Sequence, residues 1–165
     1  MKESKYTEIR KKIREILFSE TGIVIGIGNP DRADDGAGIL VVQYWKQKVS
    51  PSRSICFFLD TECSIESPVM DHLEDPLIQT FLFVDASDFG GIPGEIVLLS
   101  EKEIEKIVSP LSTHKVPLDF LFSLIQSKKK NAFLLGIQPG SLEFWGDMTE
   151  AVQNTVAMLK GWIDQ

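Results

Sequence analysis

The chain has 165 residues, of which 43% are hydrophobic and 25% charged, a composition typical of a protein that buries one sizeable core. Its formal net charge of -7 argues against a nucleic-acid backbone as the main partner. No apolar run approaches the roughly 20 residues that a membrane-spanning helix needs. The sequence therefore predicts a single domain over residues 1–165, with no membrane span and no nucleic-acid partner.

Cysteine usage points to the compartment. Cys56 and Cys63 are the 2 cysteines of the chain, too few for a disulfide framework, and the charged N-terminal segment lacks the apolar region of a signal peptide. We therefore expect a protein of the reducing cytoplasm.

Apolar strands alternate with amphipathic helices along the chain. In the first half of the chain, the pattern predicts a helix over 4–19, a strand over 22–27, a helix at 35–48, a strand over 54–59 and a short helix between Pro68 and Pro76. In the second half it predicts strands over 81–84 and 95–99, a helix at 101–108, a helix from 118 to the basic run 128–130, a strand over 132–137 and a last helix capped by Thr149. The connection between 81–84 and 95–99 is too short for a parallel crossover, so we expect these two strands to be antiparallel neighbours. The alternation predicts an α/β three-layer sandwich: a twisted, mostly parallel five-stranded sheet with one antiparallel strand, and helices on both faces.

The segment GIGNPDRADDGAG, residues 26–38, joins the first strand to the next helix. Glycine there allows close approach of backbone, and Asp31, Asp34 and Asp35 place three carboxylates just before a helix N-terminus. The segment lacks the third glycine of a dinucleotide-binding turn and the Lys-Ser/Thr pair of a phosphate-binding loop. It therefore favours a cation over a phosphate.

Polar residues follow most of the predicted parallel strands, at the sheet edge where open α/β proteins bind ligands. These residues are Asp34, Asp35, Asp60, Asp85, Asp88 and Gln138, with His114 at a loop-to-helix junction nearby. Carboxylates with one imidazole suit a divalent transition metal, and few protein ligands leave positions open for substrate. For an Asp at the start of a helix, capping is the alternative role.

Four motifs in order resemble the hydrogenase maturation proteases: GIGNPDRADDGAG, FVDASDFGGIPGE at 83–95, STHKVPL at 112–118 and LLGIQP at 134–139. The version of the family most similar to this chain acts on the large subunit of hydrogenase 3 of the [NiFe] type. The resemblance covers about residues 22–162, and residues 1–20 form an N-terminal helical extension outside it.

The resemblance implies an endopeptidase that removes a C-terminal peptide from the [NiFe] hydrogenase large-subunit precursor after nickel insertion. Family members engage nickel already held by the substrate with two acidic residues and a histidine, which match Asp35, Asp85 and His114. These three residues are thus the expected catalytic and metal-binding set, and Asp34 is expected to cap the helix. Nickel would come with the substrate, without a permanently bound metal, and we expect the protease to be a monomer of aspartic type.

The chain departs from the family pattern at one place, and its sequence is compatible with three other functions. After Asp60 the family often has glycines, where this chain has Thr61, Glu62 and Cys63, so Glu62 and Cys63 are candidates for specificity. The alternative functions are a small-ligand-binding α/β module, a non-catalytic partner in hydrogenase assembly, and a metallopeptidase with its own tightly bound metal.

Overall fold

A computed structural model describes residues 2–51, 54–104 and 118–164, and side chains from residue 5 onward. The elements in chain order are α1 (Lys2–Ser19), β1 (Gly22–Gly26), the 3-10 turn η1 (Ala33–Gly36), α2 (Ala37–Lys48), β2 (Ile55–Leu59), α3 (Glu66–His72), β3 (Thr80–Ala86), β4 (Ile96–Ser100), α4 (Glu101–Ile104), α5 (Leu118–Ser127), β5 (Asn131–Ile137) and α6 (Glu150–Gly161). No helix in these ranges has the length and apolar character to cross a membrane.

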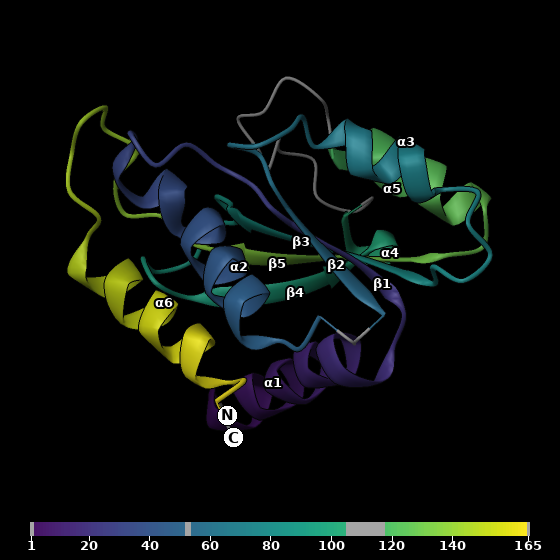
Figure 1. Ribbon diagram of the computed structural model, residues 1–165. Coiled ribbons are helices and arrows are strands. Elements are labelled where there is room, and N and C mark those ends of the chain that lie inside the picture. The colour runs from purple at the N-terminus through teal and green to yellow at the C-terminus, as the bar shows by residue number, and fades with distance from the viewer. Residues whose placement is uncertain (1, 52–53, 105–117, 165) are drawn as a thin grey trace.

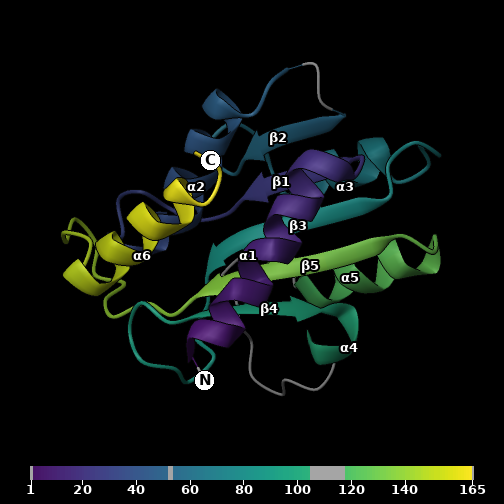
Figure 2. The same cartoon turned by 90° about the horizontal axis from the view of Figure 1, so that it is seen from below.

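The strands form one sheet between two layers of helices (Figure 1). The strand order is β2-β1-β3-β5-β4, with β4 antiparallel to β5 and the other neighbours parallel. Helices α1, α2 and α6 share one buried core with the sheet, and α3, α4 and α5 share the other (Figures 1 and 2). The predicted three-layer α/β sandwich is confirmed.

The antiparallel strand has a different neighbour from the one predicted. β4 pairs with β5 and not with β3, because β3 already pairs on one side with β1 and on the other with β5. The chain after β3 passes the end of β5, where Gly94 N–H donates to the Gln138 carbonyl at 2.9 Å and Gln138 N–H donates to that of Glu95 at 2.8 Å. The antiparallel direction was predicted correctly and the partner was not.

The predicted helices need small corrections at their ends. The helix expected to start at residue 35 begins with η1 and continues as α2, and α3 begins two residues before Pro68. Proline is tolerated there because the first turn of a helix has N–H groups without helical acceptors. Thr149 precedes α6 as predicted, but its side chain makes no cap hydrogen bond. Of the helix expected over 101–108, only Glu101–Ile104 lies within the described residues.

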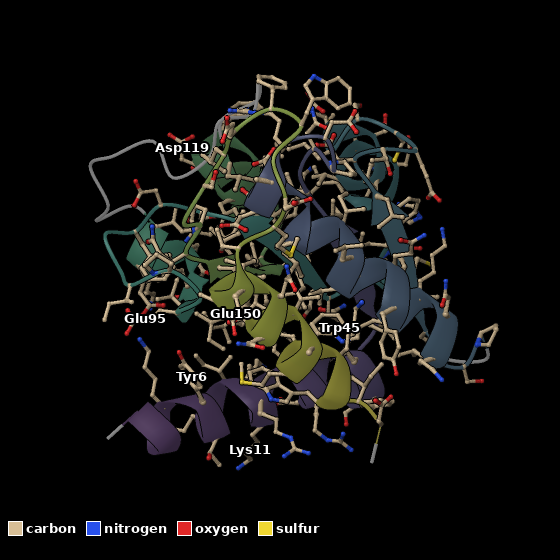
Figure 3. The ribbon with its side chains drawn as sticks, turned by 90° about the vertical axis from the view of Figure 1, so that its left-hand side faces the viewer. Tyr6, Lys11, Trp45, Glu95, Asp119 and Glu150 are labelled. Carbon is tan, nitrogen blue, oxygen red and sulfur yellow. The ribbon has the colours of Figure 1, made fainter. Side chains whose placement is uncertain are left out.

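Helix α1 is part of the core rather than an appendage. Its apolar face, with Ile13 and Ile16 fully buried, lies across the sheet on the face that also carries α2 and α6 (Figure 2). On the same face, Trp45 of α2 lies against α6, where its indole N–H donates to the Leu159 carbonyl at 3.1 Å (Figure 3).

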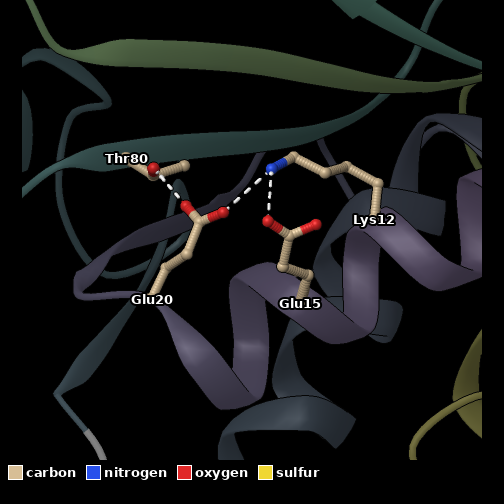
Figure 4. Close-up of polar contacts among 4 residues, drawn as sticks. All are labelled: Lys12, Glu15, Glu20 and Thr80. Atoms are coloured by element: carbon tan, nitrogen blue, oxygen red, sulfur yellow. Dashed lines mark hydrogen bonds and ion pairs between the residues drawn. The ribbon is translucent and has the colours of Figure 1, made fainter.

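A polar contact joins the end of α1 to the sheet. Glu20 accepts a hydrogen bond from the Thr80 hydroxyl and pairs with Lys12 at 2.9 Å, while Glu15 pairs with the same ammonium at 3.2 Å (Figure 4). Partial burial by itself raises the pKa of Glu20, but the bonds from Thr80 and Lys12 outweigh it and hold that pKa below the ordinary value. The contact is therefore strongest when Glu20 is ionised.

Candidate functional site

The topology gathers four loops at one edge of the sheet. Strands β1, β2, β3 and β5 are parallel, so the segments that follow them all leave from their shared carboxyl edge. In Figure 1 the segment before α6 lies beside the segment that enters α2, and backbone hydrogen bonds join the two. The candidate site is built on this edge.

Asp35 is held in the turn between β1 and α2. It belongs to η1, is 2% exposed, and accepts a hydrogen bond from the Asn29 N–H at 3.0 Å. Gly28, with φ of 136°, lies against it, and a Cβ at Gly28 would fall 1.8 Å from the Asp35 carbonyl oxygen. Only glycine fits that approach and that backbone conformation, so Gly28 serves to place Asp35.

Asp85 reaches the same edge from the centre of the sheet. It is fully buried in β3, opposite Gly136 of β5, and the Ser87 hydroxyl lies 3.4 Å from its carboxylate. The preceding carbonyl, of Val84, accepts the Ile27 N–H at 2.9 Å and lies 2.2 Å from where a Cβ of Gly38 would be. The first turn of α2 is thus pressed onto the backbone beside Asp85, and the η1 segment that carries Asp35 contacts β3.

The histidine of the predicted set, His114, lies outside the described residues, as does most of its STHKVPL motif. Within the described ranges, no three His, Cys, Asp or Glu side chains form a group that could hold a metal ion. The structure therefore brings two of the three predicted residues, Asp35 and Asp85, to one edge as buried carboxylates.

Asp34 has a role that the sequence did not reveal. The prediction that it caps the helix is wrong, because neither η1 nor α2 has a side-chain cap hydrogen bond. Its buried carboxylate instead accepts five hydrogen bonds of 2.7 to 3.1 Å from the segment that precedes α6. The donors are the N–H groups of Gly140, Ser141 and Thr149 and the Thr149 hydroxyl. Asp34 therefore fixes the Asp35 turn to the segment after β5.

Gln138 and Asp88 order the loop after β3. The Gln138 side-chain oxygen accepts the N–H groups of Phe89 and Gly91, each at 3.0 Å, and its amide donates to Asp88 at 3.1 Å. The bonds from Gln138 and the Gly90 N–H hold the pKa of Asp88 below its usual value. Asp88 thus remains an ionised, loop-ordering carboxylate at neutral pH.

The residues after β2 lie at the margin of this edge. The Asp60 carboxylate approaches the Gly28 N–H at 3.4 Å, and exposed Glu62 pairs with Lys46 at 3.1 Å. Burial, followed by the charges of Glu62 and Asp60, raises the pKa of the Cys63 thiol. A thiol with a raised pKa is a poor nucleophile at neutral pH.

The chain is similar to proteins of one known family. A family model described as hydrogenase maturation protease matches residues 57–163. The hydrogenase 3 maturation protease of Escherichia coli K12 is 29% identical over 146 residues, which cover 86% of this chain and 90% of that protein.

Solved structures of hydrogenase maturation proteases have the same fold as this chain. The [NiFe] hydrogenase maturation protease HycI from Thermococcus kodakarensis KOD1 superposes with a TM-score of 0.72 at 26% identity, covering 93% of this chain and 99% of that one. The E. coli hydrogenase maturating endopeptidase HybD shares the fold, with a TM-score of 0.66 at 20% identity over 84% of this chain and 86% of its own. The chain belongs to the hydrogenase maturation protease family and is by class a hydrolase, an endopeptidase.

Proposed function

We propose that this protein removes the C-terminal peptide from a [NiFe] hydrogenase large-subunit precursor, and that nickel already inserted in the precursor is its recognition element. The observation that carries the proposal is the placement of Asp35 and Asp85, fifty residues apart, as buried carboxylates at one edge of the sheet. Family membership and the [NiFe] substrate named for the T. kodakarensis relative support it.

In this proposal the nickel is the substrate's cargo. Asp35, Asp85 and His114 would bind its open positions, since nickel accepts mixed carboxylate and imidazole ligands. Docking would hold the scissile peptide bond beside the same edge. The protein then needs no metal of its own, and it would act as a monomer in the cytoplasm, where thiols stay reduced.

Hydrolysis requires that a water oxygen attack the scissile carbonyl carbon while the water gives up a proton. A buried aspartate at this edge can accept that proton and pass it to the departing amine as the C–N bond breaks. Polarisation of the carbonyl by the substrate's nickel would assist the same attack. In this proposal the protein is an aspartic, nickel-dependent endopeptidase, and Asp35 and Asp85 are the aspartates that carry out these steps.

The test compares Asp35→Asn, Asp85→Asn and His114→Ala with wild type on purified, nickel-loaded precursor, following the released peptide by mass spectrometry. We expect each variant to lose at least about 100-fold in processing rate, the lower range for a group in acid–base catalysis. Asp71→Asn, an exposed aspartate of α3, is the matched control and should process normally.

Three outcomes would contradict the proposal. Normal processing by all three variants would remove the assigned residues from the mechanism. Equal cleavage of precursor with and without nickel would remove nickel as the recognition element. Binding of loaded precursor by wild type without any cleavage would instead favour a non-catalytic partner in hydrogenase assembly.

A further inference from the structure

The segment between β5 and α6 presents two large aromatic side chains to solvent. Phe144 is 60% exposed and its neighbour Trp145 is 80% exposed. Aromatic side chains of this size supply much of the stability of a core when they are buried, so two adjacent exposed ones contribute little to this fold. Adjacent exposed aromatic side chains are typical of surfaces that bind another molecule.

The backbone that carries these rings is firmly held. Asp34 binds the segment at both ends, through Gly140 and Ser141 on one side and Thr149 on the other. Between these anchors the Trp145 N–H donates to the Asp31 carbonyl at 2.7 Å. The rings are thus presented by a pre-organised segment, which loses little conformational entropy when a partner binds.

Trp145 also has an unfavourable backbone conformation. Its φ of 61° lies in the left-handed region, which is unfavourable for a non-glycine residue. Glycine would relieve that strain, yet the position holds the largest side chain. Strain retained at a fully presented aromatic residue is a sign of function rather than of stability.

An arginine links these rings to the candidate site. The Arg32 guanidinium lies 4.7 Å above the Phe144 ring, and the Arg32 carbonyl accepts the Asp35 N–H at 2.9 Å. Its Nε is buried without a hydrogen-bond partner among the described residues. Arg32, Phe144 and Trp145, here called the aromatic rim, therefore form one surface that continues into the Asp35 turn.

We propose that the aromatic rim docks the polypeptide of the large-subunit precursor beside its scissile bond, with an apolar side chain of that polypeptide against Phe144 and Trp145. Arg32 supplies a cation for a carbonyl or carboxylate oxygen of the same segment. Tryptophan, tyrosine and arginine are the residue types that dominate binding energy at interfaces. The inference rests on the proposed function, because it takes its partner from that function.

The precursor fits this rim better than a second copy of the chain does. The rim is joined to the turn that carries Asp35 by the backbone bonds of Arg32 and Asp31, so a polypeptide whose scissile bond lies at that turn also comes within reach of the rim. A net charge of -7 opposes self-association of two copies. Substrate binding is therefore the contact that explains both the exposure of the rings and their position.

The informative variant is Trp145→Gly, which removes the ring and also relieves the backbone strain. We expect its Tm to be unchanged or raised, while KM for the loaded precursor rises about tenfold or more and kcat stays within about twofold, as for truncation of a dominant interface residue. Phe144→Ala should raise KM in the same direction. Leu77→Ala, a 71% exposed residue near the amino end of β3, is the control and should leave both constants unchanged.

Each result decides the question. An unchanged KM for Trp145→Gly and Phe144→Ala would overturn the docking surface while leaving the proposed function intact. A wild-type dimer in sedimentation that Trp145→Gly dissociates would assign the rim to a second copy and overturn the inference. If wild type binds loaded precursor without cleaving it, the proposed function fails, and weaker binding by Trp145→Gly in titration still supports the rim.

Discussion

Asp34 is the residue at which the structure makes its sharpest prediction about stability. Its carboxylate is fully buried and serves four donors, three backbone N–H groups and one hydroxyl. In Asp34→Asn an amide NH₂ replaces one carboxylate oxygen, so a hydrogen-bond donor of the side chain faces N–H or O–H groups that are themselves donors. The charge that strengthens all the remaining bonds is lost as well.

The cost follows from these contacts. If the amide keeps its oxygen toward Gly140 and Ser141, its nitrogen faces the Thr149 N–H, which lies 2.7 Å from the present oxygen. A hydrogen bond to a charged group contributes about 1.5–3 kcal/mol, and a buried donor left unpaired costs a further amount of similar size. We expect a loss of about 3 kcal/mol in the free energy of unfolding, or a fall in Tm of roughly 6–12 °C for a chain of this size.

Thermal and urea unfolding, followed by circular dichroism, measure this loss. Asp31→Asn is the matched control, because it makes the same chemical change in the same turn at an exposed side chain and should stay within about 0.5 kcal/mol of wild type. Equal unfolding midpoints for the two variants would refute the assigned role of Asp34.

Three further variants test other parts of the fold. Gly28→Ala should unfold at lower urea and lose processing, because its Cβ would collide with Asp35, whereas Gly90→Ala, with positive φ but open space, should only lose stability modestly. Glu20→Gln should lower the free energy of unfolding at pH 7, because a carboxylate whose pKa is lowered in the folded state stabilises the fold above its ordinary pKa of 4.5. The difference from wild type should shrink as the pH falls through the lowered pKa of Glu20. Trp45→Phe should lower the free energy of unfolding, measured by calorimetry, by about 1–3 kcal/mol, because the Leu159 carbonyl of α6 loses the buried indole donor. An unchanged free energy would exclude that bond as a stabilising contact.

Local pattern was enough to predict most of the fold. Buried parallel strands are apolar throughout, as β1 is, and the spacing of Ile13 and Ile16 marks the inward face of α1. The rule that parallel strands end at a common edge also predicts that Asp35 and Asp85 lie at the same edge of the sheet. Their proposed function with His114 stays a prediction.

What sequence reasoning missed depends on contacts between distant segments. β4 lies beside β5 because of how β3 is paired on both sides, which no property of residues 96–100 reveals. Asp34 looked like a helix cap because its neighbours in sequence begin a helix, yet its partners come 106 to 115 residues later. The one available signal was Thr149, a polar residue before a helix, and it suggested a cap instead of a partner.

The bond between Asp34 and Thr149 also has a consequence for the order of events during synthesis. Chains emerge from the ribosome with the N-terminal part first. The turn that holds Asp35 therefore leaves long before the residues that fix it, which begin at Gly140. A chain that stops short of that point carries both buried aspartates of the site but not the contact that orders their edge, so proteolytic activity should appear only after Thr149 has been made.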